Sequence, residues 1–160
     1  MTDPVLLISE SAEAAMIRAA NNSFPHETGG ILVGVHADGR PWVVGAIEIP
    51  SRDRGSHHYR IPHGTTQPAV RAARREDPRL GYLGDWHSHP SDVGPSPTDL
   101  ASLAFISIRH PLAPNPTSIV LRRTGTSYAL DAQRIVTVKP RPCAIRSTGN
   151  LPPLSDKEPT

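Results

Sequence analysis

Proline is the feature that most limits the folds open to this chain. The sequence contains 18 prolines among 160 residues. Each proline fixes its φ angle and lacks a backbone N–H, so it interrupts helices and central strands. We therefore expect short helices and strands separated by loops. The length of the chain is typical of one domain that buries its own core.

Hydrophobic spacing between the prolines predicts three helices and five strands. The helices cover residues 9–22, 65–77 and 97–108, and the strands cover residues 29–35, 42–49, 82–87, 118–123 and 127–138. A turn signal at residues 37–40 predicts a hairpin, and residues 57–61 are a candidate for a further short strand. This order predicts an α/β (mixed α+β) fold, a single domain in which helices flank a mixed central β-sheet.

The predicted caps and domain boundary follow from local sequence. Ser9 or Ser11 is expected to cap the first helix, and Ser96 to cap the third, with Pro97 in its first turn. Residues 1–139 form the predicted domain. Residues 140–160 are Pro-rich and polar, so we expect a C-terminal tail that is disordered at its end.

Composition and charge exclude several classes of protein. No apolar stretch approaches ~18 residues, so we expect no membrane span, and the N-terminal region lacks the basic and apolar segments of a signal peptide. The single cysteine, Cys143, excludes an intramolecular disulfide and a cysteine-based zinc cage, which fits a cytoplasmic protein. A net charge of +2 gives no reason to expect nucleic acid as a partner.

A candidate metal site lies in the segment His87-Ser88-His89-Pro90. Side chains two residues apart on an extended chain point to the same side, so both imidazoles can reach one ion. Asp99 lies ten residues later, at the start of a predicted helix, and the loop between can return its carboxylate to the same ion. Two histidines and a carboxylate with an open fourth position are typical of catalytic zinc. Taken alone, a His-x-His pair is more often a pair of polar or turn residues.

Glu27 is a candidate general base. It precedes an apolar strand, where a carboxylate can take a proton from water and pass it to a leaving amine. A solvated loop glutamate is the alternative that this segment by itself leaves open.

Taken together, these segments resemble the JAMM motif of the JAB/MPN metalloprotease family, and compact bacterial members most of all. The motif consists of a distant Glu, then His-x-His-Pro, then Ser-x-x-Asp. The corresponding segments here are Glu27-Thr28-Gly29-Gly30-Ile31-Leu32-Val33-Gly34, His87-Ser88-His89-Pro90 and Ser96-Pro97-Thr98-Asp99.

The resemblance implies a role for each residue of the motif. His87, His89 and Asp99 match the zinc (Zn2+) ligands, with water as the fourth. Glu27 matches the general acid/base, and Ser96 the hydroxyl that helps to hold the oxyanion. The implied fold is similar to that of cytidine deaminase. One spacing departs from the motif, since nine residues separate His89 from Asp99 where the motif has ten. The position of Asp99 relative to the two histidines therefore depends on the conformation of the loop of residues 91–95.

The function implied by the resemblance is hydrolysis of an amide bond by zinc-activated water. The implied substrate is the C-terminal tail of a ubiquitin-like or small sulfur-carrier protein, as in a deubiquitinase-like isopeptidase, with a ubiquitin-activating-like enzyme as an associated partner. Two alternatives remain open: a non-catalytic scaffold and an amidohydrolase acting on a small-molecule conjugate. Deamination is disfavoured, because the related deaminases need cysteine ligands.

The sequence leaves two interpretations open for several other residues. Trp86 is expected to pack beneath the site, with a substrate contact as the alternative, and Asp85 either supports a ligand imidazole or lies at the surface. The arginines between residues 71 and 79 form a solvated helix face or a patch for an acidic partner. A second metal site is a minor alternative for three histidines that otherwise belong to a polar loop near the cleft: His57, His58 and His63.

Overall fold

The structure is a computed structural model that describes residues 3–109 and 115–153. Its helices are α1 (Glu10–Ser23), α2 (Thr66–Glu76) and α3 (Pro97–Arg109). Its strands are β1 (Val5–Ser9), β2 (Gly29–Ala37), β3 (Arg40–Glu48), β4 (Gly81–His89), β5 (Thr117–Thr124), β6 (Ser127–Val136) and β7 (Lys139–Thr148). None of the helices in this part of the chain has both the length and the hydropathy needed to cross a bilayer.

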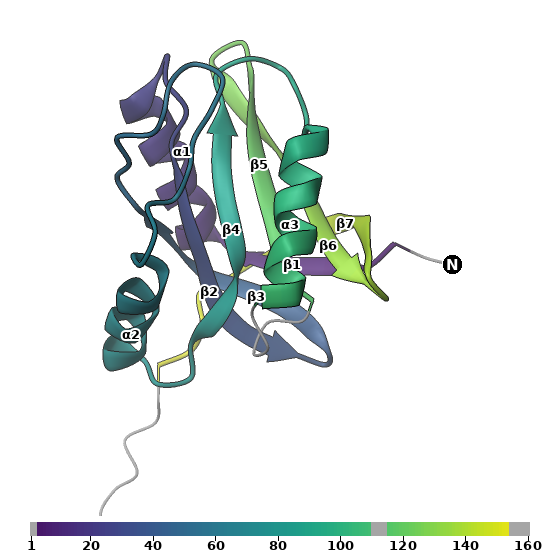
Figure 1. Cartoon of the computed structure of the whole chain (residues 1–160). Helices are drawn as coiled ribbons and strands as arrows, with labels where there is room; N and C mark the ends of the chain where they lie inside the picture. Colours follow the sequence, from purple (N-terminus) through teal and green to yellow (C-terminus); the bar gives the residue numbers. More distant parts are fainter. Residues whose placement is uncertain (1–2, 110–114, 154–160) are drawn as a thin grey trace, which may run out of the picture.

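The seven strands form one mixed sheet that closes into a barrel in the order β1-β3-β2-β4-β5-β6-β7. The pairs β1–β3, β1–β7 and β4–β5 are parallel, and the others are antiparallel. The mixed α+β single domain was therefore predicted correctly, but the central sheet flanked by helices was wrong, because the sheet closes into a barrel. Around the barrel, α1 packs mainly on β3, α2 on β2 and β4, and α3 on β6 and β7 (Figure 1).

Two strands that the sequence analysis missed close the barrel. β1 is five residues long and runs directly into α1, so its pattern is too short to stand out. β7 pairs with β6 over Lys139–Cys143 and with β1 over Ala144–Thr148. Its two prolines, Pro140 and Pro142, lie in the half that has only one neighbour, where a missing N–H is tolerated.

The predicted domain boundary and the candidate strand at 57–61 need correction. Residues 139–148 belong to the sheet, so the tail does not begin at residue 140. The expectation of disorder at the end of the tail falls on residues 154–160, outside the described residues. In the segment 57–61 only an isolated bridge forms, between Arg54 and Tyr59.

The predicted hairpin is confirmed, with Asp38 and Gly39 both at positive φ in a two-residue turn between β2 and β3.

The main core lies between the sheet and α1. Ser9 caps α1 by accepting a hydrogen bond from the N–H of Ala12, at 3.2 Å. The buried members of this core are Leu6, Ile8, Ala12, Met16, Ala20, Leu32, Val43, Leu83, Trp86, Ile119, Leu121 and Ala132. Trp86 is 1% exposed, which confirms the prediction that it packs beneath the site.

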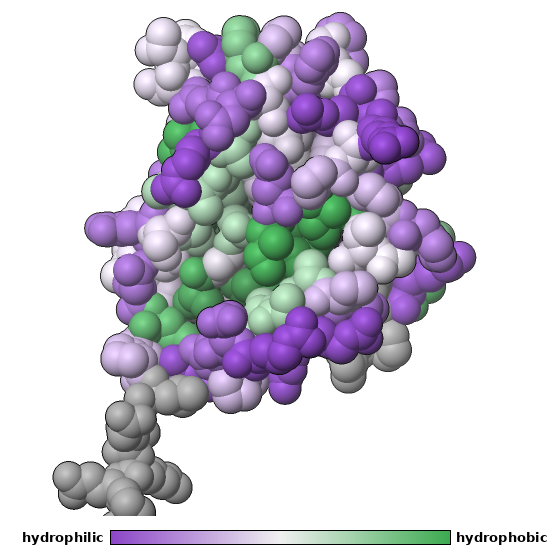
Figure 2. Space-filling view, turned by 90° about the vertical axis from the view of Figure 1, so that its left-hand side faces the viewer, coloured by the Kyte–Doolittle hydropathy of each residue, from purple (hydrophilic) through white to green (hydrophobic). Residues whose placement is uncertain are grey.

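A smaller apolar cluster lies under α2, on the other side of β2. Its buried residues are Ile31, Val33 and Ile49, and α2 adds partly buried alanine and valine side chains. The helix buries none of its residues completely, and its arginines at 71, 74 and 75 are exposed, as expected for a solvated face. Figure 2 views this side of the molecule and shows hydrophobic residues across its middle, between hydrophilic margins.

Candidate metal centre

β4 places two candidate ligands on the same side of the sheet. Trp86 and Ser88 are buried beneath it, so the alternation of a strand turns His87 and His89 the other way. Ser88 fixes this end of β4 to β2. Its Oγ accepts a hydrogen bond from the N–H of Thr28 at 3.0 Å, and its own N–H donates to the Thr28 carbonyl at 2.8 Å.

The N-terminus of α3 supplies the third candidate ligand. The Ser96 hydroxyl accepts a hydrogen bond from the N–H of Asp99 at 3.1 Å, and the Asp99 carboxylate accepts one from the N–H of Ser96 at 2.7 Å. This reciprocal pair is a capping box, with the aspartate in place of the usual glutamate. The Ser-x-x-Asp segment therefore fixes Asp99 at the same time as it starts the helix.

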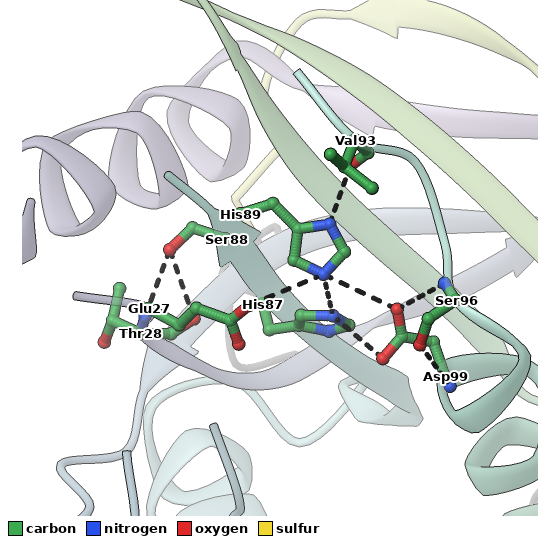
Figure 3. Close-up of polar contacts among 8 residues, drawn as sticks. All are labelled: Glu27, Thr28, His87, Ser88, His89, Val93, Ser96 and Asp99. Atoms are coloured by element: carbon green, nitrogen blue, oxygen red, sulfur yellow. Dashed lines mark hydrogen bonds and ion pairs between the residues drawn. The ribbon is translucent and has the colours of Figure 1, made fainter. Parts of the chain in front are cut away.

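The three side chains converge, as Figure 3 shows. His87 Nε2 lies 3.0 Å from His89 Nε2 and 3.2 Å from Asp99 Oδ1, and His89 Nε2 lies 3.5 Å from Asp99 Oδ2. Ligand atoms about 2.0–2.1 Å from a tetrahedral zinc ion are separated by roughly 3.3 Å, so the donor set fits this metal. The three residues form a group that could hold a metal ion.

A backbone carbonyl orients the imidazole of His89. His89 Nδ1 lies 2.7 Å from the carbonyl oxygen of Val93, which can only accept a hydrogen bond. Nδ1 therefore carries the proton, and in the neutral ring Nε2 directs its lone pair toward the point where the candidate ligands converge. Burial by itself would lower the pKa of His89. The hydrogen bonds to Asp99 and to the Val93 carbonyl have the larger combined effect, so the pKa of His89 is raised above its usual value. A bound cation would compete with that proton.

The short spacing between His89 and Asp99 still brings the Asp99 carboxylate to the two histidines. The loop is held against β5, since the Ser91 carbonyl accepts a hydrogen bond from the N–H of Arg123 at 3.2 Å. Arg122 Nη1 also donates to Asp92 Oδ1 at 2.7 Å.

Burial acts to raise the pKa of Asp99, but the hydrogen bonds from His87 and His89 hold it well below the usual range.

Glu27 lies on the side of the two imidazoles opposite Asp99 (Figure 3). Its Oε1 is 3.7 Å from His89 Nε2, and the residue is 5% exposed. Burial raises the pKa of this carboxyl, and the nearby His87 and His89 only partly offset the effect. A solvated loop glutamate, the alternative left open by the sequence, does not describe this buried side chain.

These side chains line a cleft of about 940 Å³. The loop of residues 56–61 forms part of its wall, and the first turns of α3 form another part. Ser96 also lines the cleft, so the structure brings all five residues of the motif together. Three of them are the candidate ligands, one is the buried carboxylate, and one is the capping serine.

The other residues singled out in the sequence have structural contacts. Tyr82 donates a hydrogen bond from its hydroxyl to Asp85 Oδ1 at 2.6 Å, and burial raises the pKa of Asp85 to about 6. Among the described residues, no hydrogen bond joins Asp85 to a ligand imidazole. His58 pairs with Asp53 at 3.2 Å, and the described histidines form no second metal group.

Sequence reasoning missed three features of the site: the Thr28–Ser88 pair, the Val93 carbonyl and the contacts between the loop of residues 53–61 and Glu27. Each of them involves a backbone group, for which a sequence carries no residue-specific signal. The loop itself was expected near the cleft from its histidines, and residues 56–61 do line the cleft.

Comparisons with known proteins agree with this geometry. Over residues 9–135 the chain matches the family described as prokaryotic homologs of the JAB domain. It is 32% identical, over 127 residues, to a probable metalloprotease, y4qB, of Sinorhizobium fredii, an alignment that covers 73% of this chain and 75% of the relative. Its fold is similar to the solution structure of protein DSY2949 from Desulfitobacterium hafniense, with a TM-score of 0.70 and 18% identity, covering 92% of this chain and 95% of the other. The chain therefore belongs to the JAB/MPN family, among its prokaryotic members.

Proposed function

We propose that this protein is a zinc-dependent metallopeptidase that hydrolyses an amide bond at the C-terminal tail of a ubiquitin-like or sulfur-carrier protein. The observation that carries the proposal is the convergence of His87, His89 and Asp99 beside the buried carboxylate of Glu27. Family membership and the relative named a probable metalloprotease support the general class, a hydrolytic metalloenzyme.

The chain's own residues would divide the reaction between them. Zinc held by His87, His89 and Asp99 would supply Lewis acidity and lower the pKa of water. Glu27 would take a proton from that water and donate it to the leaving amine. Because burial raises its pKa, the carboxylate is a better proton acceptor than an exposed glutamate.

Ser96 would donate to the oxyanion that develops on the substrate carbonyl. Its hydroxyl oxygen already accepts the N–H of Asp99, but that bond uses a lone pair. The hydroxyl hydrogen can still be donated into the cleft that Ser96 lines. The two roles, helix cap and oxyanion donor, are therefore compatible in one side chain.

The surroundings of the cleft support a polypeptide as the substrate. Val93 and Phe105 line the cleft, and each is 56% exposed. Ile108, one turn beyond Phe105 on α3, is 82% exposed. Exposed apolar side chains next to a polar site are typical of surfaces that bind other proteins. This favours a protein tail over a small amide, and we place the reaction in the cytoplasm, together with a ubiquitin-activating-like enzyme.

Two aminocoumarin amides test the proposal. One is ubiquitin with the reporter at its C-terminus, and the other is a five-residue peptide of the same tail with the same reporter. Release of aminocoumarin by the zinc-loaded protein, abolished by a chelator and restored by zinc, is the expected result. No release from either probe would overturn the hydrolytic function. Faster release from the peptide would overturn the preference for a protein substrate.

A further inference from the structure

We infer that the loop of residues 53–61 is a clamp that positions Glu27, with Arg54 and Tyr59 as its positioning residues. The inference deepens the proposed function and rests on it, because it concerns the residue assigned to proton transfer. It is drawn from contacts that the catalytic assignment does not use.

The carboxylate of Glu27 has few direct constraints. Among the described residues, its one close polar contact is the 3.7 Å approach to His89 Nε2, which is longer than a hydrogen bond. The place of this side chain therefore depends on where the backbone of residue 27 is held. Displacement of a reacting group by about 1 Å can lower a rate roughly 100-fold.

The loop holds both backbone polar groups of residue 27, its N–H and its carbonyl. The N–H of Glu27 donates to the carbonyl oxygen of Gly55 at 2.7 Å. Arg54 Nη1 reaches the Glu27 carbonyl oxygen at 3.4 Å and donates to Ser23 Oγ at 3.0 Å. One guanidinium group thus ties Ser23, at the end of α1, to Glu27, two residues before β2.

The loop is itself anchored at a second point. Arg54 and Tyr59 face each other across an isolated bridge, and the N–H of Gly55 donates to the His58 carbonyl at 2.9 Å. The Tyr59 hydroxyl donates to the carbonyl of Ile49 at 2.6 Å. Its ring packs closely on Gly29, where an added Cβ would meet the Trp86 carbonyl oxygen and lie 2.7 Å from the Tyr59 ring.

The clamp lines the same cleft as the candidate ligands but uses separate hydrogen bonds. His87 and His89 are held by β4 and the Val93 carbonyl, and Asp99 by the capping box, so none of their hydrogen bonds involves Arg54 or Tyr59. Weakening the clamp should therefore change proton transfer without removing the metal. If Arg54 and Tyr59 only stabilised the fold, their substitution would lower the turnover and the metal content together.

The test uses Arg54→Ala and Tyr59→Phe in the full chain, with Arg52→Ala as the matched control. Arg52 lies two residues from Arg54, is exposed, and loses the same charge. For both test variants we expect one zinc per chain as in the unaltered protein, a KM within about 2-fold and a kcat lowered roughly 10- to 100-fold on the aminocoumarin peptide. Arg52→Ala should keep its kcat.

Hydrogen exchange gives a readout that is independent of turnover. The Glu27 amide should exchange at least about 10-fold faster in Arg54→Ala, because its acceptor on Gly55 is no longer held in place. The Thr28 amide, bonded to Ser88, should not change. Unchanged exchange at Glu27, an unchanged kcat, or a fall in kcat that follows loss of zinc would each overturn the clamp. No turnover by the unaltered protein would instead overturn the proposed hydrolysis, and the exchange data would still decide whether the loop holds Glu27.

Discussion

The candidate ligands and Glu27 face the same cleft, but different kinds of contact hold them. Asp99 is fixed through its own carboxylate by the capping box with Ser96, and His89 through its ring by the Val93 carbonyl. Glu27 is held through its backbone, by Gly55 and Arg54, while its carboxylate stays without a hydrogen bond among the described residues. A metal ligand needs a fixed direction for its lone pair, whereas a proton carrier needs a free carboxylate at a fixed place.

The first prediction tests the candidate metal ligands by removing one of them. We expect His87→Ala to lose its zinc and all measurable turnover, because two ligands do not complete a catalytic zinc site. Metal analysis of the purified chain should give about one zinc per molecule before the change and none after it. His57→Ala is the matched control, since His57 lines the same cleft outside the ligand group and should keep the metal. Full zinc content in His87→Ala would contradict the site.

The second prediction removes the proposed proton carrier, Glu27, and leaves the candidate metal ligands in place. Glu27→Gln keeps the size of the side chain and removes none of the candidate ligands, so zinc should stay while kcat falls roughly 10²- to 10⁴-fold. Glu48→Gln provides the comparison, because Glu48 accepts a hydrogen bond from Thr28 at 3.2 Å and lies outside the ligand group. Turnover by Glu27→Gln at the original rate would assign the base to another residue.

Ser96→Ala sharpens the comparison by testing the residue that holds Asp99. Loss of an oxyanion donor should slow turnover roughly 10- to 1000-fold, and loss of the cap should lower the free energy of unfolding by about 1 kcal/mol. Steady-state kinetics, metal analysis and thermal unfolding separate the two roles. An unchanged rate would limit Ser96 to the helix cap. A slower rate that follows loss of zinc would show that the serine acts through Asp99.

Asp92→Ala should have the smallest effect. It removes the 2.7 Å ion pair with Arg122 on an exposed part of the loop, while Arg122 keeps its 2.8 Å contact with Asp131. Exposed ion pairs contribute about 0–1 kcal/mol, so the free energy of unfolding should change by less than about 1 kcal/mol. Zinc content should stay the same. Loss of zinc from this variant would mean that one surface ion pair decides where Asp99 lies.

Local patterns were enough to place much of the fold. The predicted helices and the β2–β3 hairpin agree with the structure to within a few residues, because each has its own cap, turn or hydrophobic period. β1 and β7 lack such signals. β1 is too short, and Pro140 and Pro142 made β7 resemble a tail, since tolerance of a proline depends on whether a second strand pairs beside it. Closure of the barrel could not be predicted without these two strands.

The sequence by itself supplied the candidate residues of the site. The residue types and spacing at positions 27, 87, 89, 96 and 99 resemble the motif of a family of metal-dependent hydrolases, and two histidines with a carboxylate are a donor set that suits a catalytic metal ion. Only the tertiary structure decided how these groups are held. The Val93 carbonyl, the Gly55 carbonyl and the distance from Glu27 to His89 arise when segments far apart in the chain pack together, and a backbone atom looks the same at every position of a sequence.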